Sequence, residues 1–214
     1  MKERTGMTPV LVGRSSSHYT RVAKIFAHEL GVEHEFRPVF DIAALDSETF
    51  ADNPTLRVPS LLTESGAWFG SQNVCRELAR RATRPTTIVW PEDLTDAASA
   101  NAQELVLEAM AAEVTIVMAK AAALEKNHPF LEKPKARIDA SVTWLERELP
   151  GVLARLPEPA LSFLEVTAFC FCTHLGFREL RSIDDCPKLV EFVRRFETRD
   201  SARATEYRFD RRSE

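Results

Sequence analysis

The sequence lacks the features that mark membrane, secreted and nucleic-acid-binding proteins. No run approaches the roughly 18 consecutive apolar residues that a membrane-spanning helix needs. The N-terminal stretch MKERTGMTPV lacks the apolar core of a secretory signal. The net charge is −4, so there is no general excess of positive charge to attract nucleic acid. We therefore expect a cytoplasmic protein that engages neither a membrane nor nucleic acid.

Cysteine is also scarce, with four in 214 residues, which is too few for the disulfide framework of a secreted domain. The four are Cys75, Cys170, Cys172 and Cys186. Cys170 and His174 stand four residues apart in FCFCTH and share one face of a helix. Because a metal site needs more ligands than this pair supplies, we expect no metal and interpret the cysteines as buried, reduced thiols.

The sequence does contain two regions with different hydrophobic periods. Residues 1–82 alternate strand-like and helix-like segments in the order βαβαββα. Residues 83–93, TRPTTIVWPED, lose this periodicity and contain two prolines, which is typical of a linker. Residues 94–214 show only helical patterns. The sequence thus predicts an α/β domain followed by an all-helical, bundle-like domain.

Three consecutive serines, Ser15, Ser16 and Ser17, stand where the first strand gives way to the first helix. Serine is a preferred N-cap residue because its side-chain oxygen accepts a backbone N–H of the first turn. The same helix N-terminus can hold an anion or lower the pKa of a thiol. These residues alone fit both a structural and a functional interpretation.

Three further motifs follow in order along the chain. They are NPTLRVPSLL at 53–62, GSQNVCREL at 70–78 and LSFLEVTAF at 161–169. The last begins with Ser162 and has Glu165 three residues later, which is the pattern of a capping box. Together with the serine segment, these motifs resemble those of cytosolic glutathione S-transferases of the bacterial type. The resemblance implies a thioredoxin-like N-terminal domain, a helical C-terminal domain and a homodimer.

The resemblance also implies a role for individual residues. Ser17 occupies the place of the catalytic residue, whose hydroxyl donates to the glutathione sulfur and favours the thiolate, with Ser16 as the runner-up. The bond between Val58 and Pro59 is expected to be cis and to present backbone groups to the cysteinyl part of glutathione. Ser71 is expected to hold the γ-glutamyl carboxylate at a helix N-terminus.

One position departs from the family pattern. Gly70 stands where relatives carry an acidic residue that holds the γ-glutamyl end of glutathione, and the neighbouring Gln72 and Asn73 offer dipoles without charge. This departure leaves a second class of function open, a non-catalytic binding or regulatory protein of the stringent-starvation type. Within this resemblance, serine instead of cysteine at position 17 favours conjugation or peroxidase-type chemistry over thiol transfer through a mixed disulfide.

The family's reaction implies a second substrate beside glutathione, a small hydrophobic electrophile of the kind removed in detoxification. It would lie in an apolar pocket between the domains. Candidate lining residues are Met110, Val114 and Met118, which recur every four residues along a long predicted helix. The same spacing is also typical of residues that pack into a core.

Overall fold

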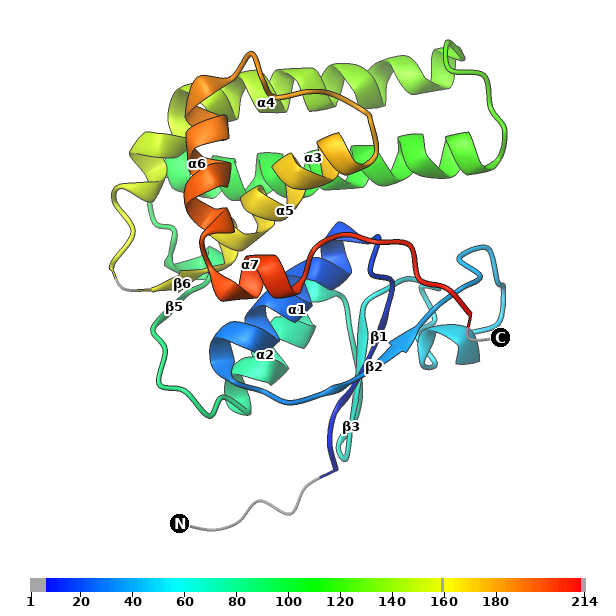
Figure 1. The fold of residues 1–214 in the computed structure, drawn as a ribbon. Coiled ribbons are helices and arrows are strands. Elements are labelled where there is room, and N and C mark those ends of the chain that lie inside the picture. Colours follow the sequence, from blue (N-terminus) through cyan, green and yellow to red (C-terminus); the bar gives the residue numbers. More distant parts are fainter. Residues whose placement is uncertain (1–6, 159, 213–214) are drawn as a thin grey trace. The chain divides into compact units, whose positions relative to one another are not determined.

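The computed structural model describes residues 7–158 and 160–212 (Figure 1). The chain divides into two compact units. One unit holds the chain up to Thr86 together with the segment from Asp200 onward, and the other holds Thr87–Arg199. The C-terminal segment therefore groups with the α/β unit, whereas the sequence predicted a helical domain that continues to residue 214. Contacts of this segment with the first helix, described below, are the reason.

The first unit is built around a four-stranded sheet in the order β2-β1-β3-β4. Strand β2 is parallel to β1, and β3 and β4 each run antiparallel to the preceding strand in the sheet. The elements are β1 (Val10–Gly13), α1 (His18–Leu30), β2 (Glu35–Pro38), η1 (Glu48–Phe50), β3 (Ser60–Thr63), β4 (Gly66–Phe69), α2 (Ser71–Arg80) and α7 (Asp200–Ala204). This confirms the predicted topology, with a single 3-10 turn, η1, as the second helical element.

Alternation along β1 directs side chains to the two faces of this sheet. Leu11 pairs with Leu61 of β3, and both are buried. Val12 points to the opposite face, because successive strand residues alternate, and joins a buried cluster with Phe50 and Ala51. Helices α1 and α2 pack against each other beside the sheet (Figure 1).

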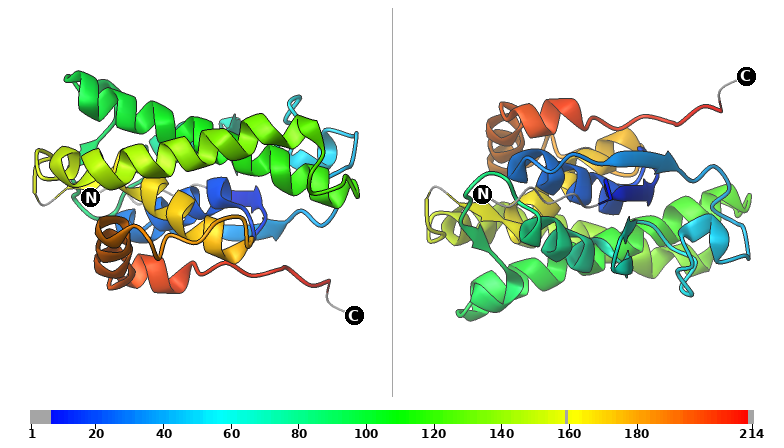
Figure 2. Two further views of the ribbon diagram at one scale, coloured as in Figure 1. Left: turned by 90° about the horizontal axis from the view of Figure 1, so that it is seen from above. Right: turned by 90° about the horizontal axis from the view of Figure 1, so that it is seen from below.

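The second unit is helical, as predicted, apart from one short pair of parallel strands. Its elements are β5 (Ile88–Val89), η2 (Pro91–Asp93), α3 (Ala97–Ala121), η3 (Pro129–Leu131), α4 (Glu132–Leu153), β6 (Leu161–Ser162), α5 (Phe163–Phe177) and α6 (Pro187–Glu197). Helices α3 and α4 lie side by side (Figure 2). None of the helices in the described part of the chain combines the length and apolar composition that crossing a bilayer requires.

Helix α5 forms the buried centre of this unit because it is apolar on nearly all sides. Its N-terminus is capped by Ser162, whose Oγ accepts the backbone N–H of Glu165 at 3.3 Å. The predicted N-cap is thus confirmed. The carboxylate of Glu165 also accepts a hydrogen bond from Arg199 at 3.1 Å, which ties the start of α5 to the end of this unit.

Candidate functional site

Helix α1 begins directly after a tight turn that starts at Arg14. The turn is closed by the N–H of Ser17, which donates to the carbonyl oxygen of Arg14 at 3.0 Å. Ser17 has an extended backbone, and its Oγ accepts the N–H of Thr20 at 3.3 Å. Ser17 is therefore the N-cap of α1. Because a hydroxyl has one donor and two acceptor positions, the proton of Ser17 remains able to donate to a ligand.

The three serines differ in exposure. Ser15 and Ser16 are 5% and 1% exposed, whereas Ser17 is only partly buried. The Oγ of Ser15 accepts a hydrogen bond from the ammonium of Lys24 at 3.1 Å. Of the three hydroxyls, that of Ser17 is the best placed to meet a molecule from solvent.

A second segment of the candidate site precedes β3. The peptide bond between Val58 and Pro59 is cis, as the family resemblance implied. Val58 is partly buried, and its backbone lies at the bend that leads into the strand. The carbonyl oxygen of Pro59 accepts the N–H of Gly70 at 3.1 Å, which joins this bend to the start of α2.

The N-terminus of α2 is the third segment. Ser71 is the first residue of the helix and is 9% exposed, with Gln72 partly buried and Asn73 exposed after it. Gly70 precedes them with φ 80° and ψ 149°. The N–H groups of a first turn have no partner within their helix, and together with the helix dipole they favour an anion. This end of α2 is suited to a carboxylate.

The register of the sheet places the three segments at the same end of its strands. Val12, near the end of β1, pairs with Ser60, which begins β3. Ser60 also pairs with Phe69, which ends β4. The end of β1, the start of β3 and the end of β4 therefore lie together. The segments attached to these strand ends are the turn before α1, the Val58–Pro59 bend and the start of α2. Residues far apart in the sequence converge there to offer a hydroxyl, backbone groups and a helix N-terminus.

The three residues predicted to line a second-substrate pocket all lie on α3 and differ in burial. Met110 is completely buried, which fits a core residue. Val114 and Met118 are each 38% exposed, so their side chains are accessible on the helix surface.

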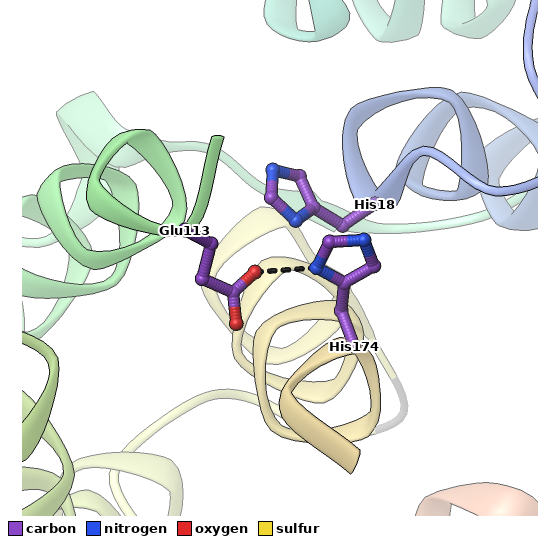
Figure 3. A group of neighbouring side chains, drawn as sticks. All are labelled: His18, Glu113 and His174. Atoms are coloured by element: carbon purple, nitrogen blue, oxygen red, sulfur yellow. Dashed lines mark hydrogen bonds and ion pairs between the residues drawn. The ribbon is translucent and has the colours of Figure 1, made fainter. Parts of the chain in front are cut away.

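A buried carboxylate–imidazole pair in the helical unit was missed by the sequence analysis. Glu113 on α3 and His174 on α5 place Oε2 and Nδ1 2.6 Å apart (Figure 3). Arg178 donates from Nε to Nε2 of His174 at 3.2 Å, an arrangement that suits the Nδ1–H tautomer. Burial raises the pKa of Glu113 well above its usual value, and the positive charge of Arg178 opposes the shift. The sequence signal that could have revealed this pair is Glu113 itself, an acidic residue among apolar residues of a long helix.

The N-terminal part of the chain matches a known family model. Residues 11–86 match the family model described as the N-terminal domain of glutathione S-transferase. No curated protein sequence matches the chain significantly.

Solved structures extend the similarity in fold to nearly all of the chain. A glutathione transferase family member from Pseudomonas fluorescens Pf-5 with bound glutathione is 20% identical, with 94% of this chain and 100% of that chain covered and a TM-score of 0.78. A glutathione S-transferase from Methylobacillus flagellatus KT with glutathione bound is 18% identical, with 94% and 100% covered and a TM-score of 0.73. FzlA from C. crescentus is 11% identical, with 93% and 92% covered and a TM-score of 0.71.

Proposed function

Because residues 11–86 form a glutathione S-transferase N-terminal domain and the whole chain has the glutathione transferase fold, we propose that this protein is a glutathione transferase. It adds the thiolate of glutathione to a small hydrophobic electrophile. The observation that carries the proposal is the position of Ser17. This residue is the partly buried N-cap of α1. It lies at the same end of the strands as the Val58–Pro59 bend and Ser71.

In this mechanism Ser17 is a hydrogen-bond donor and not the nucleophile. Its hydroxyl donates to the sulfur of glutathione, and a bond to the charged form of a group favours that form. An unperturbed thiol titrates near pH ~8.5, so lowering its pKa by one unit raises the thiolate fraction at pH 7 by roughly eightfold. The thiolate then attacks the electrophilic carbon, forming the C–S bond as the leaving group departs or the double bond takes up a proton.

The rest of glutathione is held by backbone groups and by α2. The N–H and C=O of Val58 pair with the cysteinyl part, and Ser71 with the first turn of α2 binds the γ-glutamyl carboxylate. Gln72 adds a neutral amide. Gly70 offers no charge to the γ-glutamyl ammonium, so we expect glutathione to bind more weakly than in a variant with an acid at this position.

The second substrate and the assembly complete the proposal. The accessible aliphatic side chains of Val114 and Met118 are the candidates for contact with the electrophile, and the buried Met110 supports them from the core. We also propose a homodimer. The apolar side chains of Trp68 and Phe69, partly buried on the edge strand β4, support it, and light scattering over a range of concentrations tests it.

The glycine at position 70 also favours a second candidate function, a non-catalytic binding or regulatory role for the same fold. The two functions differ in a simple observable. A transferase binds glutathione and turns over an electrophile, whereas a binding module gives no Ser17-dependent conjugation at any glutathione concentration.

The experiment that tests the proposed function is a calorimetric titration with glutathione followed by a conjugation assay with 1-chloro-2,4-dinitrobenzene. Ser17→Ala is expected to lower kcat and to raise the pKa of the bound thiol, with little change in glutathione affinity. Ser16→Ala is the matched control and is expected to have a smaller effect. Absence of glutathione binding in the wild type would contradict the proposal, and a reversed order of the two variants would move the catalytic role to Ser16.

A further inference from the structure

The C-terminal segment after α7 is bound to the first unit through a buried arginine of α1. Arg21 is 6% exposed, and it donates to the carbonyl oxygen of Ala202 at 3.1 Å and to Oγ1 of Thr205 at 3.5 Å. Its guanidinium carbon also lies 4.4 Å from the centre of the Tyr207 ring. A buried charge is tolerated only with such partners. Helix α7 and the residues after it are therefore fixed alongside α1 (Figure 1).

The same segment then reaches the turn that precedes α1. The backbone N–H of Ser15 donates to Oδ2 of Asp210 at 2.8 Å, and the carbonyl oxygen of Ser15 accepts the N–H of Arg208 at 3.4 Å. With Lys24 bound to its Oγ, Ser15 has its N–H, its carbonyl and its hydroxyl all engaged. Two of these three bonds come from the C-terminal segment.

These bonds fix the peptide groups on either side of Ser15. The N–H belongs to the plane that joins Arg14 to Ser15, and the carbonyl belongs to the plane that joins Ser15 to Ser16. Both planes lie inside the turn that the Ser17 N–H closes on Arg14. Because the orientations of both peptide groups are fixed, the backbone that leads to Ser17 is fixed as well.

We propose that Asp210 is a positioning residue of the thiolate site, which fixes Ser15 and thereby the turn that aims the Ser17 hydroxyl. The inference rests on the proposed function for the role of Ser17. A carboxylate suits this task because its bond to an N–H is charge-assisted and stronger than a neutral one. The C-terminal segment is on this view a part of the site and not a mere anchor of α7.

The charges around the turn support this arrangement. The ammonium of Lys24, which donates to Ser15 Oγ, lies 3.4 Å from the centre of the Phe36 ring. Burial lowers the pKa of Lys24 to about 8, the charge of Asp210 opposes the shift, and Arg208 adds to it. Asp210 and Lys24 therefore act on the same residue, since Asp210 accepts the N–H of Ser15 and Lys24 donates to its Oγ.

The test compares Asp210→Ala and Asp210→Asn with Glu206→Ala, an exposed carboxylate of the same segment. The first readout is hydrogen exchange of the Ser15 amide, which needs no ligand. Loss of a charge-assisted bond is expected to speed this exchange about tenfold in Asp210→Ala. Asn retains a neutral acceptor and is expected to fall between Ala and the wild type. The Glu206 variant is expected to match the wild type.

The second readout is the pKa of the bound glutathione thiol, followed by the ultraviolet absorbance of the thiolate. In Asp210→Ala we expect a higher thiol pKa and a kcat lowered about three- to tenfold, with the KM for glutathione nearly unchanged. Asn is expected to restore part of both. Faster exchange with unchanged thiol pKa and kcat would reduce Asp210 to a structural anchor and overturn the inference. A wild type that binds no glutathione would instead refute the proposed function, and the positioning role with it.

Discussion

The backbone N–H of Gly70 donates to the carbonyl oxygen of Pro59 at 3.1 Å and so joins the bend before β3 to the first turn of α2. Gly70 makes this bond with φ 80° and ψ 149°, close to a region of backbone space that glycine alone populates readily. Space is not the reason for glycine here, because no heavy atom of the described residues beyond its chain neighbours lies within 4 Å of a Cβ built at this position. The backbone conformation is the reason.

Gly70→Asp is therefore expected to lower the stability of the protein while it increases the affinity for glutathione. The strained backbone is present in both free and bound protein, so it lowers the free energy of unfolding by about 1–3 kcal/mol without opposing the ligand. A charge-assisted bond to the γ-glutamyl ammonium is expected to contribute about 1–2 kcal/mol to binding, or roughly five- to thirtyfold in affinity. Denaturant unfolding and calorimetry measure the two effects.

Two controls isolate these terms. Gly70→Ala is expected to lose the same stability without any gain in binding, because it carries the strain without the charge. Gly176→Ala, at an uncrowded helical position of α5, is expected to be neutral or slightly stabilising. A folded Gly70→Asp variant with unchanged glutathione affinity would mean that another group already holds the ammonium.

Much of the first unit could be predicted from local sequence. The order of strands and helices follows from short patterns, and the cis bond at Pro59 follows from motifs that resemble those of glutathione S-transferases. Each of these features depends on residues that are close together in the chain.

The parts that escaped prediction depend on contacts between distant residues. Ser15 and Asp210 are 195 residues apart, and Glu113 and His174 are 61 apart. No periodicity links such positions, because a single hydrogen bond or ion pair has no repeat. The sequence predicted a helical domain that continues to residue 214, whereas Arg21 donates to the carbonyl oxygen of Ala202 and the segment from Asp200 onward belongs to the first unit.

Ser162→Ala tests the capping of α5. Loss of the bond from the Glu165 N–H is expected to lower the free energy of unfolding by about 0.5–2 kcal/mol. Ser47 precedes η1 without a capping bond from its side chain, so Ser47→Ala is the matched control and is expected to stay within about 0.5 kcal/mol of the wild type. Glutathione affinity of the folded protein is expected to be the same in both. Equal stability of the two variants would contradict the capping role.

Glu113 is expected to make stability depend on pH. Burial raises its pKa in the native state above the usual value of 4.5. As the pH rises above this value, Glu113 therefore loses its proton in the unfolded state before it does so in the native state, and the native state binds more protons. Its contribution to stability therefore falls as pH increases above about 4.5. In Glu113→Gln this titration is absent, and the variant is expected to gain stability relative to the wild type as pH rises. Unfolding curves across this range, with His174 and Arg178 intact, measure the difference, and a difference that does not change with pH would contradict the shift.

Lys24 is expected to produce the opposite slope at higher pH. Burial lowers its pKa from 10.5 to about 8, so between these values the unfolded state binds more protons than the native state. Stability then rises with pH across this window, because deprotonation removes the cost of a partly buried charge. Lys24→Met cannot titrate, so the wild type is expected to gain on this variant between pH 8 and pH 10.5. Lys188→Met, at an exposed position of α6, controls for the loss of one positive charge. If the free energy of unfolding of each variant differs from that of the wild type by an amount that does not change with pH, the ammonium of Lys24 is not buried as the structure indicates.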